Sequence, residues 1–306
     1  MRPIGHVKEV SRSKSWPGHI ALLGQTMVIC IGYVVGREAA QRFDPFLLTG
    51  LRAWGSALVY IGLWSFFRRW GWVSHDWGSL SAVWKKRLWL LSFLGVFCNQ
   101  LLFNWGLRYT TAATTALIYA LTPSVVFWLG VWVFRKERVS WNKLLGLFSA
   151  YGGVLLALWH NLLHSAHGWG WLLILMAVGF WGWYLNFSPP ILTRLGAMQV
   201  TAIVMVLGGI LHTPTLFWGI FRQDWSVLGG YAWLSLLYLI LGMSVTAYLL
   251  LNAGLGYLSP TQAALYISLQ PLGTTALAAS MGQEPLSWQL FVAALLTTGG
   301  MWIFRR

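Results

Sequence analysis

The sequence predicts an all-α polytopic membrane protein with ten transmembrane helices, arranged as two inverted repeats of five helices each. Of the 306 residues, 57% are hydrophobic and 9% are charged, which leaves too little polar surface for a soluble domain. The apolar residues form continuous blocks of about 20 residues, the length that an α-helix needs to cross a bilayer. Continuous blocks also disfavour a β-barrel, whose strands alternate residue by residue. The third observation is an internal repeat.

The chain contains two copies of one pattern. The first copy contains Asn104, Gly106, Leu107, Tyr109, Ala116, Leu117, Leu121 and Pro123, which recur 148 positions later as Asn252, Gly254, Leu255, Tyr257, Ala264, Leu265, Leu269 and Pro271. The match continues after a slip of one residue. A repeat of about half the chain is too long for a solenoid, and it predicts two lobes related by a pseudo-axis.

Hydropathy places five spans in each copy. The first repeat, 17–159, contains the expected spans 17–36, 45–67, 87–106, 111–134 and 141–159. The second repeat, 169–304, contains the expected spans 169–187, 197–220, 231–253, 260–282 and 287–304. We expect the polar, histidine-containing stretch 160–168 to link the two repeats, with no soluble domain.

An odd number of spans per repeat requires the two copies to lie in opposite orientations in the membrane. With a cytoplasmic amino terminus, sixteen Lys and Arg residues fall on inner segments, four on outer segments, and Arg52 within a helix. This bias predicts that both termini are cytoplasmic. It also explains the net charge of +14 without nucleic acid, because the basic residues are scattered over separate loops.

The sequence lacks the signatures of other classes of protein. There is no H-E-x-x-H, G-x-S-x-G or P-loop motif, so we predict neither an enzyme nor a cofactor. Cys30 and Cys98 fall within spans and are interpreted as packing residues without a disulfide. His160, His164 and His167 could share one helix face, but with no Cys or carboxylate nearby an interfacial turn is favoured over a metal site.

Acids are missing from the predicted membrane interior, since none of the seven lies in the middle of a span. The one intramembrane ion is Arg52, which has two interpretations: it binds a carboxylate of the substrate, or it is a structural arginine that reaches carbonyl groups. Uncharged polar side chains in hydrocarbon need partners, so they must face the protein interior. Asn104 and Asn252 are repeat equivalents and are interpreted as structural.

Aromatic and polar side chains within spans are the candidates for the wall of a central cavity. Packing or lipid contact is the usual role of a deep tryptophan, yet Trp181 and Tyr184 cluster on the sixth span and make it the preferred aromatic wall. The candidate lining residues are Gln25, Tyr33, Arg52, Asn99, Tyr119, Trp181, Tyr184, Tyr266 and Gln270.

Pro123 and Pro271 occupy equivalent places near the middle of the fourth and ninth spans. Each lacks the amide that would bond the carbonyl four residues earlier, at Tyr119 and Ile267. Two symmetry-related broken helices provide a hinge in alternating-access carriers, and we expect these prolines to act in that way.

The chain also resembles a known family. The G-L-R-Y-T-T-A segment, the T-P at Thr122 and Pro123, the K-E-R-V-S turn and the Y-G-G-V-L-L-A segment look like an EamA domain of the drug/metabolite transporter superfamily. A second EamA-like copy begins at Asn252 and contains G-Q-E-P-L-S-W. The resemblance implies a ten-helix, inverted-repeat carrier in the cytoplasmic (inner) membrane of a bacterium, often an exporter of amino acids or other small metabolites. In such proteins the first, third, fourth, sixth, eighth and ninth helices would surround the cavity, with the fifth and tenth at the periphery.

These observations predict a secondary transporter, by alternating access, of small amphipathic metabolites, with amino-acid export as the leading hypothesis. Two alternatives remain open: a carrier of phosphorylated or nucleotide-linked metabolites, and a channel or scaffold that transports nothing. The expected partners are a small-molecule substrate and the lipid bilayer, without nucleic acid. A monomer suffices, because the fused inverted pair removes the need for a second chain.

Overall fold

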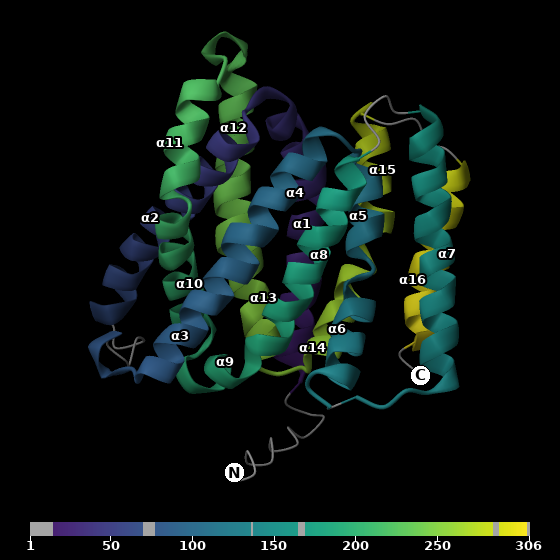
Figure 1. Cartoon of the computed structure of the whole chain (residues 1–306), viewed down its shortest axis with the longest axis horizontal. Coiled ribbons are helices and arrows are strands. Elements are labelled where there is room, and N and C mark those ends of the chain that lie inside the picture. The colour runs from purple at the N-terminus through teal and green to yellow at the C-terminus, as the bar shows by residue number, and fades with distance from the viewer. Residues whose placement is uncertain (1–14, 70–76, 136, 165–168, 284–287, 305–306) are drawn as a thin grey trace.

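The computed structural model describes residues 15–69, 77–135, 137–164, 169–283 and 288–304. Every regular element in this part of the chain is a helix, and the helices form one bundle (Figure 1). The all-α prediction is therefore confirmed.

The first half covers its five predicted spans with helix. Its elements are α1 (Trp16–Arg42), α2 (Pro45–Arg69), the 3-10 turn η2 (Trp77–Ser79), α3 (Ala82–Leu91), the π-helical segment η3 (Ser92–Cys98), α4 (Asn99–Arg108), α5 (Ala112–Tyr119), α6 (Thr122–Trp132) and α7 (Trp141–His164). Elements α3, η3 and α4 are continuous, so together they make the third predicted span.

The second half repeats this order. Its elements are α8 (Gly170–Phe187), α9 (Pro189–Leu195), α10 (Ala197–Leu211), α11 (Thr213–Arg222), the 3-10 turn η4 (Trp225–Val227), α12 (Gly230–Tyr238), the π-helical segment η5 (Leu239–Thr246), α13 (Ala247–Leu255), α14 (Pro260–Ile267), α15 (Gln270–Ser280) and α16 (Trp288–Phe304). Helix α9 lies where the sequence predicts a loop. Gly196, with φ of 77°, separates it from α10 at a bend of 115°.

By length and composition, six helical stretches of the described residues can cross a membrane, or up to seven if the bent pair α9 and α10 counts as one span. The predicted span 260–282 is divided at Ser268 and Leu269 into two helices of 8 and 11 residues. Neither is long enough to cross alone. The protein is a multi-pass membrane protein, and ten crossings stay a prediction.

One close helix contact occurs twice, with the two halves exchanged. At the start of α1, a Cβ built on Gly18 would lie 2.8 Å from the Cβ of Tyr257, which follows α13. At the start of α8, a Cβ built on Gly170 would lie 2.7 Å from the Cβ of Tyr109, which follows α4. Tyr109 and Tyr257 are equivalent in the sequence repeat. The helices α1 and α13, and likewise α8 and α4, can approach this closely because the glycines have no side chain.

Helices α7 and α16 pack side by side at one edge of the bundle (Figure 1). A Cβ on Gly300 would lie 2.5 Å from the carbonyl oxygen of Gly146, and a Cβ on Gly153 would lie 2.6 Å from that of Ala293. From Gly146 to Gly153 along α7, the contacting residue of α16 goes back from Gly300 to Ala293, so the two helices run antiparallel. Because positions 153 and 300, and 146 and 293, are equivalent in the repeat, this interface relates the halves by a pseudo-twofold axis.

The two ends of the bundle differ in what they hold. The start of α1 and the end of α16 lie toward the same end, which also holds Glu137, while α1, α4 and α11 finish at the opposite end (Figure 1). Large apolar side chains such as Phe148 on α7 are exposed on the outside of the bundle, as expected of a surface that faces lipid.

Candidate functional site

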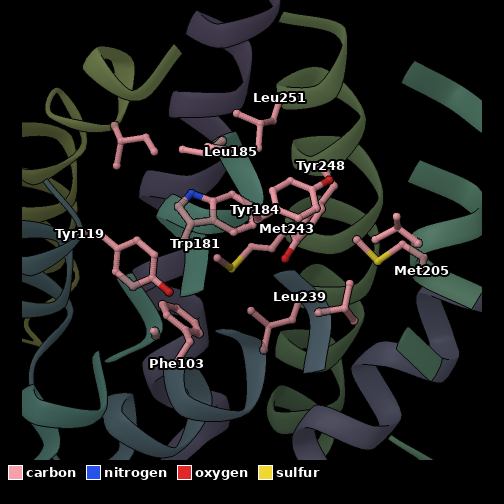
Figure 2. Close-up of a cluster of buried hydrophobic side chains, with 14 of the residues drawn as sticks. Phe103, Tyr119, Trp181, Tyr184, Leu185, Met205, Leu239, Met243, Tyr248 and Leu251 are labelled. Carbon is pink, nitrogen blue, oxygen red and sulfur yellow. The ribbon is translucent and has the colours of Figure 1, made fainter. Parts of the chain in front are cut away.

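A small cavity lies at the centre of the bundle, where both halves contribute side chains. Its lining residues are Gln25, Ile29, Tyr33, Arg52, Asn99, Gln100, Phe103, Tyr119, Trp181, Met243, Ala247, Tyr248, Leu251, Ile267 and Gln270. Figure 2 shows the aromatic part of this wall, with Trp181 among Tyr119, Tyr248 and Met243. The cavity volume is about 40 Å³. Sites for small molecules usually measure about 300–1,000 Å³, so this cavity must widen to hold a metabolite.

Arg52 brings a positive charge to this cavity from α2. Its side chain is 3% exposed. Its Nε donates to the Oγ of Ser244 at 2.7 Å, and its Nη1 donates to the Oδ1 of Asn104 at 3.5 Å. Among the described residues, no carboxylate lies within 4 Å of the guanidinium. A buried charge without an opposite charge is costly, so an anionic group in the cavity would stabilise Arg52; substrate binding by Arg52 stays a prediction.

The repeat equivalents Asn104 and Asn252 hold the third and eighth spans against the second and seventh. The Nδ2 of Asn104 donates to the Oγ1 of Thr49 at 3.0 Å, and the Nδ2 of Asn252 donates to the Oγ1 of Thr201 at 2.8 Å. Both asparagines are fully buried, so these bonds lie in the protein interior. The two remaining amide oxygens differ, because Asn104 accepts from Arg52 whereas Asn252 accepts from the Tyr184 hydroxyl at 3.0 Å.

Two amide oxygens at the cavity have no hydrogen-bond partner among the described residues: the Oε1 atoms of Gln25 and Gln100. Both side chains are buried, at 4% and 1% exposure. An unsatisfied buried acceptor costs about 1–3 kcal/mol, so each oxygen is poised to accept from a donor in the cavity. The neighbouring Asn99 is already engaged, since its Nδ2 donates to the Tyr119 hydroxyl at 2.8 Å.

Both proline-containing spans are broken beside the cavity, at the places that the sequence predicts. Pro123 and Pro271 each lie in the first turn of the second helix, α6 or α15. Pro123 has no amide hydrogen, so the carbonyl of Tyr119, four residues earlier, lacks its helical partner. That carbonyl accepts from the Oγ1 of Thr122 at 2.5 Å. Tyr119 and Gln270 therefore reach the cavity from the two break points.

The two π-helical segments occupy equivalent places and are held in equivalent ways. The Tyr60 hydroxyl on α2 donates to the carbonyl of Val245 in η5 at 2.6 Å. The Nε2 of His212, after α10, lies 3.2 Å from the carbonyl of Val96 in η3. Positions 60 and 212 are separated by the same 152 residues as Thr49 and Thr201. Each half thus supplies a side-chain partner to a carbonyl in the π-helical segment of the other half. His212 is a buried, hydrogen-bonded packing residue.

Seven of the nine predicted lining residues meet at the cavity: Gln25, Tyr33, Arg52, Asn99, Tyr119, Trp181 and Gln270. Tyr184 lies behind Trp181, with the two rings stacked at 5.0 Å between centroids, and it supports Asn252. Tyr266 lies in a separate hollow near the α1 start, where its hydroxyl is 2.5 Å from the Nδ1 of His19. Substrate contact by any of these residues stays a prediction.

Eight of the fifteen lining residues were not predicted, and two of these, Gln100 and Tyr248, occupy equivalent positions and carry polar groups. Gln100 on α4 and Tyr248 on α13 are 148 residues apart, and the Nε2 of Gln100 lies 3.4 Å from the Tyr248 hydroxyl. Their equivalence was the available signal, because positions close to a pseudo-axis meet each other.

The second span also contributes, through Arg52, to a wall that the family resemblance assigns to six other helices. The paired α7 and α16 lie away from the cavity.

Two polar contacts join the halves at opposite ends of the bundle. At the end that holds the α1 start, the Oε1 of Glu137 accepts from the Oγ1 of Thr261 at 2.8 Å. At the opposite end, the Nε2 of Gln283 donates to the Oε1 of Glu38 at 3.2 Å.

No group of three or more metal-binding side chains comes together among the described residues. The side chains of His160, His164 and His167 lie outside the described residues.

The family model of the EamA-like transporter family matches residues 16–159 and 168–306. A crystal structure of a protein superposes on 96% of this chain and 96% of its own, with a TM-score of 0.67 and 19% identity, which shows a shared fold. The chain is 22% identical to the uncharacterized transporter YetK of Bacillus subtilis over 95% of this chain and 87% of that protein. It is 25% identical to an uncharacterized transporter of Archaeoglobus fulgidus over 92% and 95% of the two chains.

A shorter match, 27% identical over 40% of each chain, is to a protein of Streptantibioticus cattleyicolor named "Probable terminal-alkyne amino-acid exporter". The family model covers both repeats, and the predicted resemblance is confirmed. The chain belongs to the EamA-like transporter family.

Proposed function

We propose that the protein is a secondary transporter that exports small zwitterionic metabolites, with amino acids as the leading substrates, by alternating access through the central cavity. The observation that carries this proposal is the chemistry of the cavity: one buried cation, two unsatisfied amide oxygens and an aromatic wall.

Each part of an α-amino acid has a matching group in this wall. Arg52 is placed to receive the carboxylate, and the free Oε1 atoms of Gln25 and Gln100 are placed to accept hydrogen bonds from the ammonium group. Phe103 and Trp181 offer apolar ring faces for the side chain. A zwitterion satisfies all three at once, whereas a simple carboxylate leaves the two acceptors unsatisfied.

Transport then requires the cavity to widen and to open at one end at a time. The contacts of Glu137 with Thr261 and of Glu38 with Gln283 lie at opposite ends and join the two halves. Breaking one while keeping the other opens a single route, with the breaks before Pro123 and Pro271 as hinges. Export toward the outside, with both chain ends in the cytoplasm of a bacterial inner membrane, completes the proposal. It agrees with the printed name of the Streptantibioticus relative.

The two alternatives make different demands on the cavity. A phosphorylated or nucleotide-linked substrate carries about two negative charges on a phosphate group, and the described cavity offers one cation, Arg52. A channel needs an open path and a scaffold needs no polar cavity. Zwitterion transport therefore fits the residues best.

Counterflow in proteoliposomes tests the proposal. Vesicles loaded with an unlabelled L-amino acid should accumulate the same labelled amino acid, and Arg52→Gln should abolish this accumulation. Arg194→Gln, which removes an arginine that lies over the Trp84 ring far from the cavity, is the matched control and should retain it. Accumulation of sugar nucleotides or sugar phosphates in place of amino acids would support the first alternative, and ion conductance without exchange would support a channel.

A further inference from the structure

A second, larger hollow lies at the end of the bundle opposite the α1 start. We call it the terminal basin; Arg42, Asp44, Trp105, Arg108, Trp169 and Arg222 are among its lining residues. Its volume is about 490 Å³, against about 40 Å³ for the central cavity. Binding sites for small molecules usually measure about 300–1,000 Å³, so the basin is large enough for a metabolite in the conformation described.

Three arginines reach the basin from three different helices. Arg42, Arg108 and Arg222 are the last residues of α1, α4 and α11, where positive charge favours a helix carboxyl end. Helix ends alone do not explain why they converge on one hollow. The Nη1 of Arg108 donates to the carbonyl of Phe43 at 3.1 Å, and the Nε of Arg222 lies 3.4 Å from the Oδ2 of Asp44. Arg42 forms an ion pair within its own helix at 3.5 Å and is 40% exposed.

Two carboxylates lie in the same basin. The Oδ1 of Asp44 accepts the amide of Phe46 at 2.9 Å and so caps α2. The Oδ1 of Asp224 accepts both the hydroxyl of Ser226 at 2.6 Å and its amide at 3.0 Å. These bonds, first of all that from the Ser226 hydroxyl, lower the pKa of Asp224 and keep it ionised. The basin therefore contains both signs of charge, which suits a zwitterion better than a polyanion.

An aromatic wall completes the basin. Four rings contact one another in sequence: Phe46 with Trp105 at 5.5 Å, Trp105 with Trp169 at 6.1 Å, and Trp169 with Tyr109 at 4.6 Å between centroids. All four residues line the basin. Such a wall offers an apolar surface to a side chain and ring faces to an ammonium group.

We propose that the terminal basin is a second binding site, specific for zwitterionic amino acids with apolar or aromatic side chains. The arginines bind the carboxylate, the aspartates and ring faces bind the ammonium group, and the aromatic wall binds the side chain. The inference rests on the proposed function for its role in transport: the basin holds the substrate at one end of the bundle while the central cavity is too small to admit it. Binding at the basin itself does not depend on transport.

Site-directed protection of a cysteine tests the basin directly. Gln41 is exposed and lines the basin, so Gln41→Cys, in a chain with Cys30→Ala and Cys98→Ala, places one thiol at its rim. Modification by a charged methanethiosulfonate reagent is followed in detergent micelles without phospholipid. L-Phenylalanine, L-leucine or L-tryptophan should slow it, whereas phenethylamine and 3-phenylpropanoate, which each lack one charge, should be at least tenfold weaker.

The variants separate this site from the cavity. Arg108→Gln should raise the concentration for half-protection about tenfold or more, because a charge-assisted hydrogen bond to the carboxylate is lost. Arg108→Lys should restore part of the effect, and Arg194→Gln should change nothing. Arg52→Gln should keep full protection while abolishing counterflow. Melting temperatures and gel filtration of each variant establish that it is folded.

The outcomes distinguish the two proposals. Protection without any amino-acid counterflow would support the basin and overturn the proposed function. Counterflow that depends on Arg52, without protection by any of the three amino acids, would overturn the basin and leave the function standing. Protection by a short-chain phosphatidylethanolamine, but not by amino acids, would assign the basin to a lipid headgroup and also overturn it.

Discussion

Replacing Arg52 by methionine should make the protein more stable and inactive at the same time. The guanidinium is 3% exposed, has one good hydrogen bond, to Ser244 at 2.7 Å, and one long contact, to Asn104 at 3.5 Å. A hydrogen bond to a charged group contributes about 1.5–3 kcal/mol. Burying an ion costs several kcal/mol, and replacing buried ionic groups by apolar ones of similar volume is often neutral or stabilising by about 1–4 kcal/mol. Since no carboxylate compensates Arg52 in the described chain, the cost exceeds the gain.

The assay is thermal unfolding of the purified protein in detergent, paired with counterflow on the same preparations. At about 2–4 °C per kcal/mol, the melting temperature of Arg52→Met should rise by about 2 °C or more. Arg194→Met is the control on an exposed arginine and should shift it by less. The amino acid that gives counterflow should raise the melting temperature of the parent chain but not that of Arg52→Met. If Arg52 were a structural arginine, its loss would lower the melting temperature, and that result would refute the reasoning.

Two further predictions concern the scaffold. Gly153→Ala should lower the melting temperature, because the added Cβ would lie 2.6 Å from a carbonyl oxygen of α16 and overpacking costs about 1–3 kcal/mol. Gly152→Ala is the control and should not lower it, since a Cβ there would have no atom within 4 Å. Equal melting temperatures for the two variants would contradict the packing of α7 against α16. Pro123→Ala restores the missing amide at the break between α5 and α6 and should slow counterflow several-fold. Pro260→Ala, at the start of α14, is the control and should leave the counterflow rate unchanged. Equal rates for the two variants would exclude the break between α5 and α6 as a hinge.

The helices could be predicted from hydropathy, because a helix that crosses hydrocarbon must be apolar and a long block of apolar residues has few other roles. Helix α9 and the two π-helical segments were not predicted. Helix α9 is short and follows directly on α8, so its residues read as a loop. The π-helical segments depend on Tyr60 and His212, which bond carbonyls 185 and 116 residues away. No local pattern reveals such a partner.

The cavity could be predicted in part for a similar reason. Polar side chains in a membrane span must face the interior, which directed attention to Gln25, Arg52 and Asn99. An interior position does not determine whether a side chain lines the cavity or packs elsewhere. Tyr184 bonds Asn252 and Tyr266 bonds His19, so neither lines the cavity. Asn104 and Asn252 are interpreted as structural because they are equivalent in the repeat, and each donates to a threonine of the preceding span. Gln100 and Tyr248 also occupy equivalent positions, and they line one shared space because both lie near the pseudo-axis.

The symmetric scaffold carries an asymmetric charge, and this asymmetry fixes how a substrate can bind. The separation of 152 residues that relates Thr49 to Thr201 places Val204 at the position equivalent to Arg52. The cation of the cavity therefore belongs to the first half, and the amide oxygen of Asn252 accepts from Tyr184 where that of Asn104 accepts from Arg52. A symmetric cavity would accept a zwitterion in two opposite orientations. Under the proposed function, the single arginine of the described cavity should hold the carboxylate toward α2 throughout, so we expect the substrate to keep its orientation while the two halves exchange which end is open.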